Sequence, residues 1–232
     1  MDILKPAKAG SHTSDLPRAE VPPGTKGAVM RQLLLTSSFS ATANRLPTFL
    51  EDSPKNHTVA FIPTANLPQR SDGYVQEARR AFTDMGCRID DLEVSTADPE
   101  TIRRSLEEDD MIYLSGGNTF FLLQELRRSG AADLIRQQVN QGKPYIGESA
   151  GAVVTGPDIG FLDAMDPRSA APDLDSTTGL GLVDFRLLPH LDSEPFAEVT
   201  RKILDHYGDD GPMVAISNSQ AVAVHGQCLT IL

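Results

Sequence analysis

The chain has 232 residues, a formal net charge of −11 at pH 7 and 40% hydrophobic residues. The negative balance excludes broad electrostatic attraction to nucleic acid or anionic membranes, because their phosphates would be repelled. No apolar run approaches the roughly 18 residues that span a bilayer, so we expect a soluble protein. We expect its partner to be a small molecule or peptide, and a homodimer is left open.

Residues 1–29 are rich in proline and glycine and have little hydrophobic periodicity. They are predicted to form a disordered leader or an added extension, and residues 30–232 a single α/β domain. The two cysteines, Cys87 and Cys228, have no C-x-x-C spacing, which favours reduced thiols and a cytoplasmic location.

From residue 30 onward, short apolar runs alternate with helical patterns. Such alternation implies right-handed crossovers and a mostly parallel sheet with helices on both faces, so we expect a three-layer αβα sandwich. Ligands of this fold class bind at the carboxyl ends of the strands. The expected strands are 32–38, 58–63, 87–94, 111–114, 145–146, 181–190, 213–217, 221–225 and 228–231, the last two forming a hairpin. The expected helices are 41–50, 73–85, 99–108, 120–126, 132–140 and 195–207, and residues 156–178 are expected to form a long loop.

A G-x-S-x-G motif, Gly147 to Gly151 with Ser149 at its centre, directly follows the short apolar run at 145–146. This is typical of a nucleophile elbow, where the serine backbone is strained and a Cβ on either glycine would collide with its neighbours. The N–H of Ala150 would then point towards a developing oxyanion. An ordinary junction rich in small residues gives the same pattern, so the motif needs support from elsewhere in the chain.

A serine nucleophile needs a base, and His190 is the best candidate among five histidines. Among the five, only His190 ends a predicted strand just past a proline, Pro189. The diglycine Gly116-Gly117 also follows a strand end, which places it at the same edge of the sheet.

The chain resembles the peptidase E family of serine dipeptidases in three separated segments: 115–120 (SGGNTF), 145–152 (YIGESAGA) and 188–190 (LPH). This family is related to cyanophycinase within the class I glutamine amidotransferase-like fold, and the similarity extends from about Arg31 to the C-terminus. The resemblance implies Ser149 as nucleophile and His190 as general base. It also implies an oxyanion hole from the N–H of Ala150 and that of Gly116 or Gly117. No metal or other cofactor is implied.

The resemblance leaves the third catalytic residue open. Some members of the family place an aspartate shortly after the nucleophile, which here is Asp163 or Asp166, and we favour Asp166. Others place an acid in a late turn, where this chain has Asn218, an amide that can still accept the imidazole N–H. Asp192, two residues beyond His190, is a further candidate.

Members of the aspartyl dipeptidase type release N-terminal aspartate, which requires a cation in the site. Arg201 lies where the specificity arginine of the family would fall, and Glu148 is a candidate for binding the substrate amino group. The predicted function is therefore a serine dipeptidase for peptides with N-terminal Asp. The alternatives are an esterase or peptidase of other specificity, or a catalytically silent homologue that binds an amino acid, for which the amide at Asn218 argues.

Overall fold

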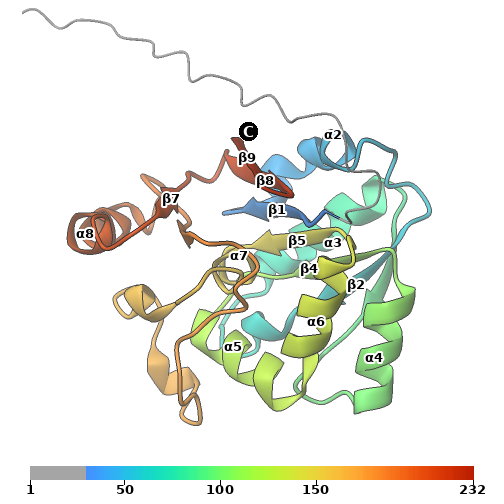
Figure 1. Cartoon of the computed structure of the whole chain (residues 1–232), viewed down its shortest axis with the longest axis horizontal. Helices are drawn as coiled ribbons and strands as arrows, with labels where there is room; N and C mark the ends of the chain where they lie inside the picture. Colours follow the sequence, from blue (N-terminus) through green and yellow to red (C-terminus); the bar gives the residue numbers. More distant parts are fainter. Residues whose placement is uncertain (1–29) are drawn as a thin grey trace, which may run out of the picture.

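The computed structural model describes residues 30–232, and the predicted leader at 1–29 lies outside the described part. A seven-stranded sheet forms its centre, in the order β3-β2-β4-β5-β1-β8-β9 (Figure 1). From β3 to β1 the neighbours pair in parallel, whereas β8 is antiparallel to β1 and β9 to β8. The predicted α/β class with a mostly parallel sheet is confirmed. The strands are β1 (Gln32–Thr36), β2 (Thr58–Ile62), β3 (Arg88–Asp91), β4 (Met111–Leu114), β5 (Tyr145–Glu148), β8 (Ala221–His225) and β9 (Cys228–Ile231).

Helices cover both faces of this sheet, which gives the three predicted layers (Figure 1). Successive side chains of a strand point to opposite faces, so Leu34 packs on one helical layer while Leu33 and Leu35 pack on the other. One layer contains α1 (Phe39–Thr42), α2 (Leu46–Leu50) and α3 (Gly73–Asp84). The other contains α4 (Pro99–Glu108), α5 (Thr119–Arg128), α6 (Ala131–Asn140) and the short α7 (Ala150–Val153).

Side-chain caps fix where two of these helices begin. Asp98 accepts hydrogen bonds from the N–H groups of Glu100 and Thr101, and Pro99 is the first helical residue, where the predicted helix 99–108 begins. Asn118 accepts from the N–H of Phe121 and so begins α5 directly after the diglycine turn. The second cap places the start of α5 at the carboxyl end of the sheet.

The strand predicted at 181–190 is mostly wrong. Only β6 (Arg186–Leu188) forms there, and it pairs in parallel with β7 (Met213–Ala215) in a separate two-stranded sheet. Residues before β6 instead bond to the segment after α7: the N–H of Leu180 donates to the carbonyl of Val154 at 2.7 Å, and that of Leu182 to Thr155 at 2.8 Å. The buried leucines therefore give this segment the hydrophobic pattern of a strand, although the segment is not hydrogen-bonded into a sheet.

The small sheet and α8 (Ala197–Tyr207) lie beyond the carboxyl ends of the central strands (Figure 1). The long connection predicted at 156–178 contains only two short 3₁₀ helices, Gly160–Leu162 and Arg168–Ala170. Both segments approach the edge where β1, β4 and β5 end. Among the described helices, none is both long enough and apolar enough to cross a membrane.

Candidate active site

Ser149 occupies a sharp turn between β5 and α7. Its backbone angles, φ 47° and ψ −107°, are strained for a residue with a Cβ. Its N–H donates to the carbonyl of Thr36 at 2.8 Å, which ties the turn to β1. A Cβ at Gly147 would lie 2.6 Å from the carbonyl oxygen of Gly151, and one at Gly151 would lie 2.2 Å from that of Leu114. The close approach of β5, α7 and β4 therefore requires both glycines, as the elbow motif predicts.

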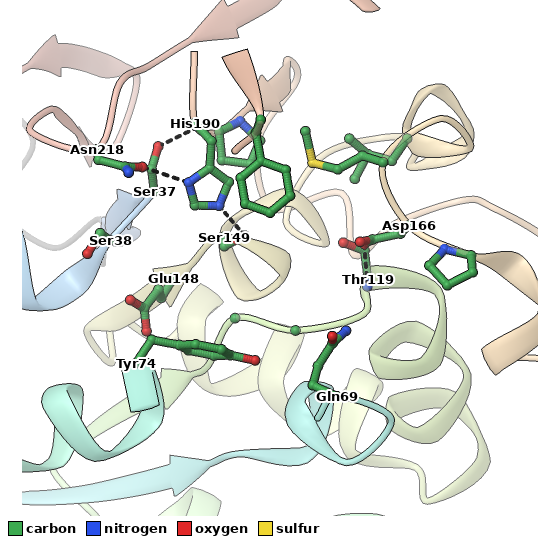
Figure 2. A pocket seen from close by; sticks show the side chains of 17 residues that line it. Ser37, Ser38, Gln69, Tyr74, Thr119, Glu148, Ser149, Asp166, His190 and Asn218 are labelled. Atoms are coloured by element: carbon green, nitrogen blue, oxygen red, sulfur yellow. Dashed lines mark hydrogen bonds between the residues drawn. The ribbon is translucent and has the colours of Figure 1, made fainter. Parts of the chain in front are cut away.

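The structure brings His190 to this serine (Figure 2). Ser149 Oγ lies 2.9 Å from Nε2 of His190, although 41 residues separate them in the chain. The N–H of His190 donates to Ser37 Oγ at 3.0 Å, and the hydroxyl of Ser37 donates to the carbonyl of Ile216. The imidazole also stacks on Phe196, with ring centroids 4.8 Å apart. The loop after β1 and the start of α8 thus fix the imidazole over the elbow.

Asn218 is the residue that faces the other nitrogen of this imidazole. Nδ1 of His190 lies 2.6 Å from Oδ1 of Asn218, and the backbone N–H of Asn218 donates to Ser193 Oγ. Because an amide oxygen can only accept, Nδ1 carries the proton and Nε2 is free to accept one from Ser149. Burial lowers the pKa of His190, and the bond to Asn218 opposes this shift only in part. The imidazole is therefore neutral at pH 7, the form a general base needs.

The position of Asp166 corrects its assignment as the residue that orients His190. Its Oδ2 accepts the N–H of Thr119 at 2.7 Å, at the N-terminus of α5 (Figure 2). The loop is held there because Nδ2 of Asn118 donates to the carbonyl of Pro167. Packing against α5 therefore holds this aspartate on the opposite wall of the cavity, out of contact with the histidine.

The other two aspartates are also engaged away from the imidazole. Asp163 forms an ion pair with Arg168, and Asp192 forms one with Arg201. Both pairs lie at the surface, where such interactions contribute little stability. Neither of these aspartates contacts His190, so the amide at Asn218 is the group that the fold supplies.

The diglycine turn lies directly beside the nucleophile. A Cβ on Gly116 would be 3.3 Å from that of Ser149, and Gly117 has a φ of 140°, which favours glycine. The N–H groups of Ala150 and of Gly116 or Gly117 are therefore the candidate oxyanion donors that this turn supplies.

Glu148 is buried beneath the turn and is bonded to the protein through both oxygens. It accepts from Phe39 N–H at 2.8 Å and from the hydroxyl of Tyr113. Burial raises the pKa of Glu148 to about 7, and these two hydrogen bonds oppose the rise. Glu148 also lines the pocket, but its bonds to neighbouring elements make it a support of the turn more than a free ligand for substrate.

A cavity of about 350 Å³ opens in front of Ser149 and His190 (Figure 2). The apolar part of its lining includes Leu162, Met165 and Phe196, and the polar floor includes Gln69 and Tyr74. Within residues 30–232, no group of three or more His, Cys, Asp or Glu side chains is arranged to hold a metal ion.

Arg201 lies outside this cavity, which corrects its assignment to substrate binding. Its Nε donates to Asp192 Oδ1 at 2.6 Å, and 68% of its side chain is exposed on α8. None of the described residues that line the cavity is a lysine or an arginine. The register of α8 therefore points this cation to solvent.

Sequence reasoning missed Ser37, Tyr74 and Phe196. A signal for Ser37 was present, because it lies at the carboxyl end of the predicted strand 32–38, at the edge where ligands of this fold bind. Tyr74 and Phe196 gave no such signal, since each lies at the start of a helical region whose orientation depends on tertiary packing.

Comparisons with known proteins identify the family to which this chain belongs. The family model "Peptidase family S51" matches residues 33–232. An uncharacterized peptidase of Pasteurella multocida is 44% identical over 85% of this chain and 95% of its own, and the peptidase E of Haemophilus influenzae is 33% identical over 78% and 79%. The crystal structure of a candidate peptidase E protein from Listeria monocytogenes EGD-e is 39% identical, covers 88% of this chain and 98% of its own, and superposes with a TM-score of 0.84. This likeness confirms the class I glutamine amidotransferase-like fold. The chain belongs to peptidase family S51.

Proposed function

We propose that this peptidase is of the serine type and hydrolyses small peptides through an acyl-enzyme on Ser149. The observation that carries the proposal is the 2.9 Å contact between Ser149 Oγ and Nε2 of a buried imidazole whose Nδ1 bonds to Asn218. A nucleophile in contact with a base, and that base held by a third group, is the arrangement that activates a serine.

The reaction follows from these positions. Ser149 Oγ attacks the scissile carbonyl carbon while Nε2 of His190 takes the hydroxyl proton, and the oxyanion lies near the N–H groups of Ala150 and of Gly116 or Gly117. When the C–N bond breaks, the imidazolium gives its proton to the leaving amine, and an ester on Ser149 remains. Water then attacks this ester, with its proton passing to Nε2 and back to Ser149 Oγ as the acid product leaves.

The size of the cavity supports short substrates. A cavity of about 350 Å³ is at the lower end of the range for small-molecule sites, about 300–1,000 Å³, and so suits a dipeptide better than a folded chain.

A preference for N-terminal Asp would need a cation, and the described residues lining the cavity include no lysine or arginine. We therefore propose a peptidase without this preference, and a panel of Asp-Leu, Glu-Leu and Leu-Leu dipeptides tests it.

Labelling with a fluorophosphonate tests the serine mechanism directly. We expect covalent modification of the peptide that contains Ser149, detected by mass spectrometry, and none in Ser149→Ala. Ser40→Ala is the matched control, because Ser40 is exposed on α1 and, within residues 30–232, its hydroxyl bonds only to Ser38 and Glu77. A folded wild-type protein that stays unlabelled would instead support the silent homologue that binds an amino acid.

Substitutions of Asn218 should shift the pH profile of kcat/KM in opposite directions. Asn218→Ala removes the hydrogen bond that raises the pKa of His190, so the acid limb moves to lower pH and kcat/KM falls, by about 10- to 100-fold. Asn218→Asp places a negative charge beside Nδ1, which favours the imidazolium and moves the limb to higher pH. Profiles from pH 4 to 9 with one dipeptide measure both shifts. Unchanged limbs in both variants would show that Asn218 does not act on the base.

A further inference from the structure

Asp166 places a carboxylate on the wall of the active-site cavity, facing Ser149 and His190 from the far side (Figure 2). One of its oxygens, Oδ2, is fixed by the N–H of Thr119 at 2.7 Å. The loop that carries it is anchored through the bond from Asn118 to Pro167. The carboxylate is therefore held in one position before any substrate arrives.

No basic side chain among the described residues forms an ion pair with this carboxylate. Arg168, two residues further along the chain, pairs with Asp163 and lies over the ring of Phe120. The described residues lining the cavity include no lysine or arginine, as noted above. Asp166 thus differs from Asp163 and Asp192, each of which forms an ion pair with an arginine.

The cavity around Asp166 has a negative character. Burial raises the pKa of Tyr74, and the nearby charges of Glu148 and, to a smaller extent, Asp166 raise it further. Both carboxyls therefore act on the same phenol in the cavity floor. Burial likewise raises the pKa of Asp166 itself, while the bonds to Thr119 oppose the shift. A partly desolvated carboxylate without a cation is unfavourable, and a cation that enters the cavity relieves this cost.

We propose that Asp166 binds an ammonium group of the peptide substrate and so makes the enzyme selective for positively charged substrates. Either the N-terminal ammonium or the side-chain ammonium of an N-terminal lysine can supply this group. The inference rests on the proposed peptidase activity and names the residue that selects its substrates. A carboxylate already held in place forms a charge-assisted hydrogen bond with little loss of side-chain freedom.

Two substrate pairs distinguish the sources of the ammonium. Comparing Leu-Leu with N-acetyl-Leu-Leu removes the N-terminal charge, and comparing Lys-Leu with norleucyl-leucine removes the side-chain charge at similar length. In the wild-type enzyme we expect kcat/KM to be higher by about 10- to 100-fold for the charged member of at least one pair. The pair that shows the difference identifies which ammonium binds.

Asp166→Asn tests the residue, because an amide oxygen can still accept the N–H of Thr119 while the charge is lost. We expect this variant to lose the preference, so that the ratio of kcat/KM between the charged and the uncharged member of the pair falls to about one. Asp163→Asn, in the same loop but exposed and paired with Arg168, is the matched control and should keep the preference.

The outcome of this experiment is separable from that of the proposed function. Fluorophosphonates carry no ammonium, so labelling of Ser149 should be equal in the wild-type protein and Asp166→Asn, which also shows that the variant is folded. If neither pair differs in the wild-type enzyme, or if Asp166→Asn keeps the preference, the inference is wrong although labelling still occurs. The wild-type comparison needs no variant, so misfolding of Asp166→Asn leaves it valid.

Discussion

Replacing His190 with alanine should lower kcat/KM for dipeptide hydrolysis by about 10⁴-fold, because Ser149 Oγ then loses the base 2.9 Å away that removes its proton. Ser149→Ala should cost about as much. The double variant should be no worse than either single one, since a nucleophile and its base act as a unit. Steady-state kinetics with one dipeptide, at enzyme concentrations high enough to detect the residual rate, measure all three.

His206→Ala is the matched control for this substitution. His206 is exposed near the end of α8 and contacts Tyr207, away from the elbow. Its replacement should leave kcat/KM within about twofold, as expected for a surface position. If His190→Ala kept a tenth or more of the wild-type rate with a normal fold, another group would have to be the base.

The same histidine sets the pH dependence of the wild-type enzyme. Burial lowers its pKa from the ordinary value of 6.5, so the neutral base persists to lower pH than in an exposed histidine. The activity should therefore be retained through pH 6.5 and fall only at lower pH, as the imidazole becomes protonated.

Gly151→Ala should destabilise the whole domain, because the added methyl would lie 2.2 Å from the carbonyl oxygen of Leu114 and 2.7 Å from its Cβ. Backbone of β4 and α7 would have to separate, at a cost of about 3 kcal/mol or more in the free energy of unfolding. For a domain of this size that corresponds to a fall in Tm of about 6–12 °C. Urea unfolding followed by circular dichroism measures the free-energy change.

Two other glycines separate the effect of contact from that of backbone conformation. Gly73→Ala, at the start of α3, meets nothing closer than the hydroxyl of Ser71 at 3.7 Å and should be neutral within about 0.5 kcal/mol. Gly130→Ala has no neighbour within 4 Å but a φ of 79°, so it should cost about 1–2 kcal/mol. If Gly151→Ala were no worse than Gly130→Ala, the close packing of the elbow on β4 would not be what requires the glycine.

Both partners in the candidate catalytic contact have strained backbones, and the surrounding structure holds them. Ser149 has a φ of 47° and His190 a φ of 63°. Each is fixed by a bond to the end of β1 or the loop that follows it: Ser149 N–H to the carbonyl of Thr36, and His190 N–H to Ser37 Oγ. Strain of this kind persists only where neighbouring bonds determine the position. Residues 36–37 therefore join two segments that are distant in sequence.

The sequence by itself was sufficient for features whose cause is local. The elbow is one, because a Cβ on Gly147 would collide with Gly151 and Ala152, which lie only a few residues further along the chain. The start of α4 at Asp98 and Pro99 is another, since a cap acts on the next turn of helix. The strand at 111–114 and the parallel sheet followed from buried runs alternating with amphipathic helices.

Only the tertiary structure decided which side chain faces His190 and which carboxylate faces the cavity. Asn218 and Asp166 come from loops whose course depends on long-range contacts, with Ser193 for the first and α5 for the second. Arg201 turned outward because the orientation of α8 is set by the core it covers, not by its own sequence. Local sterics can be read along the chain, whereas the direction of a loop side chain is set by partners that only folding brings near.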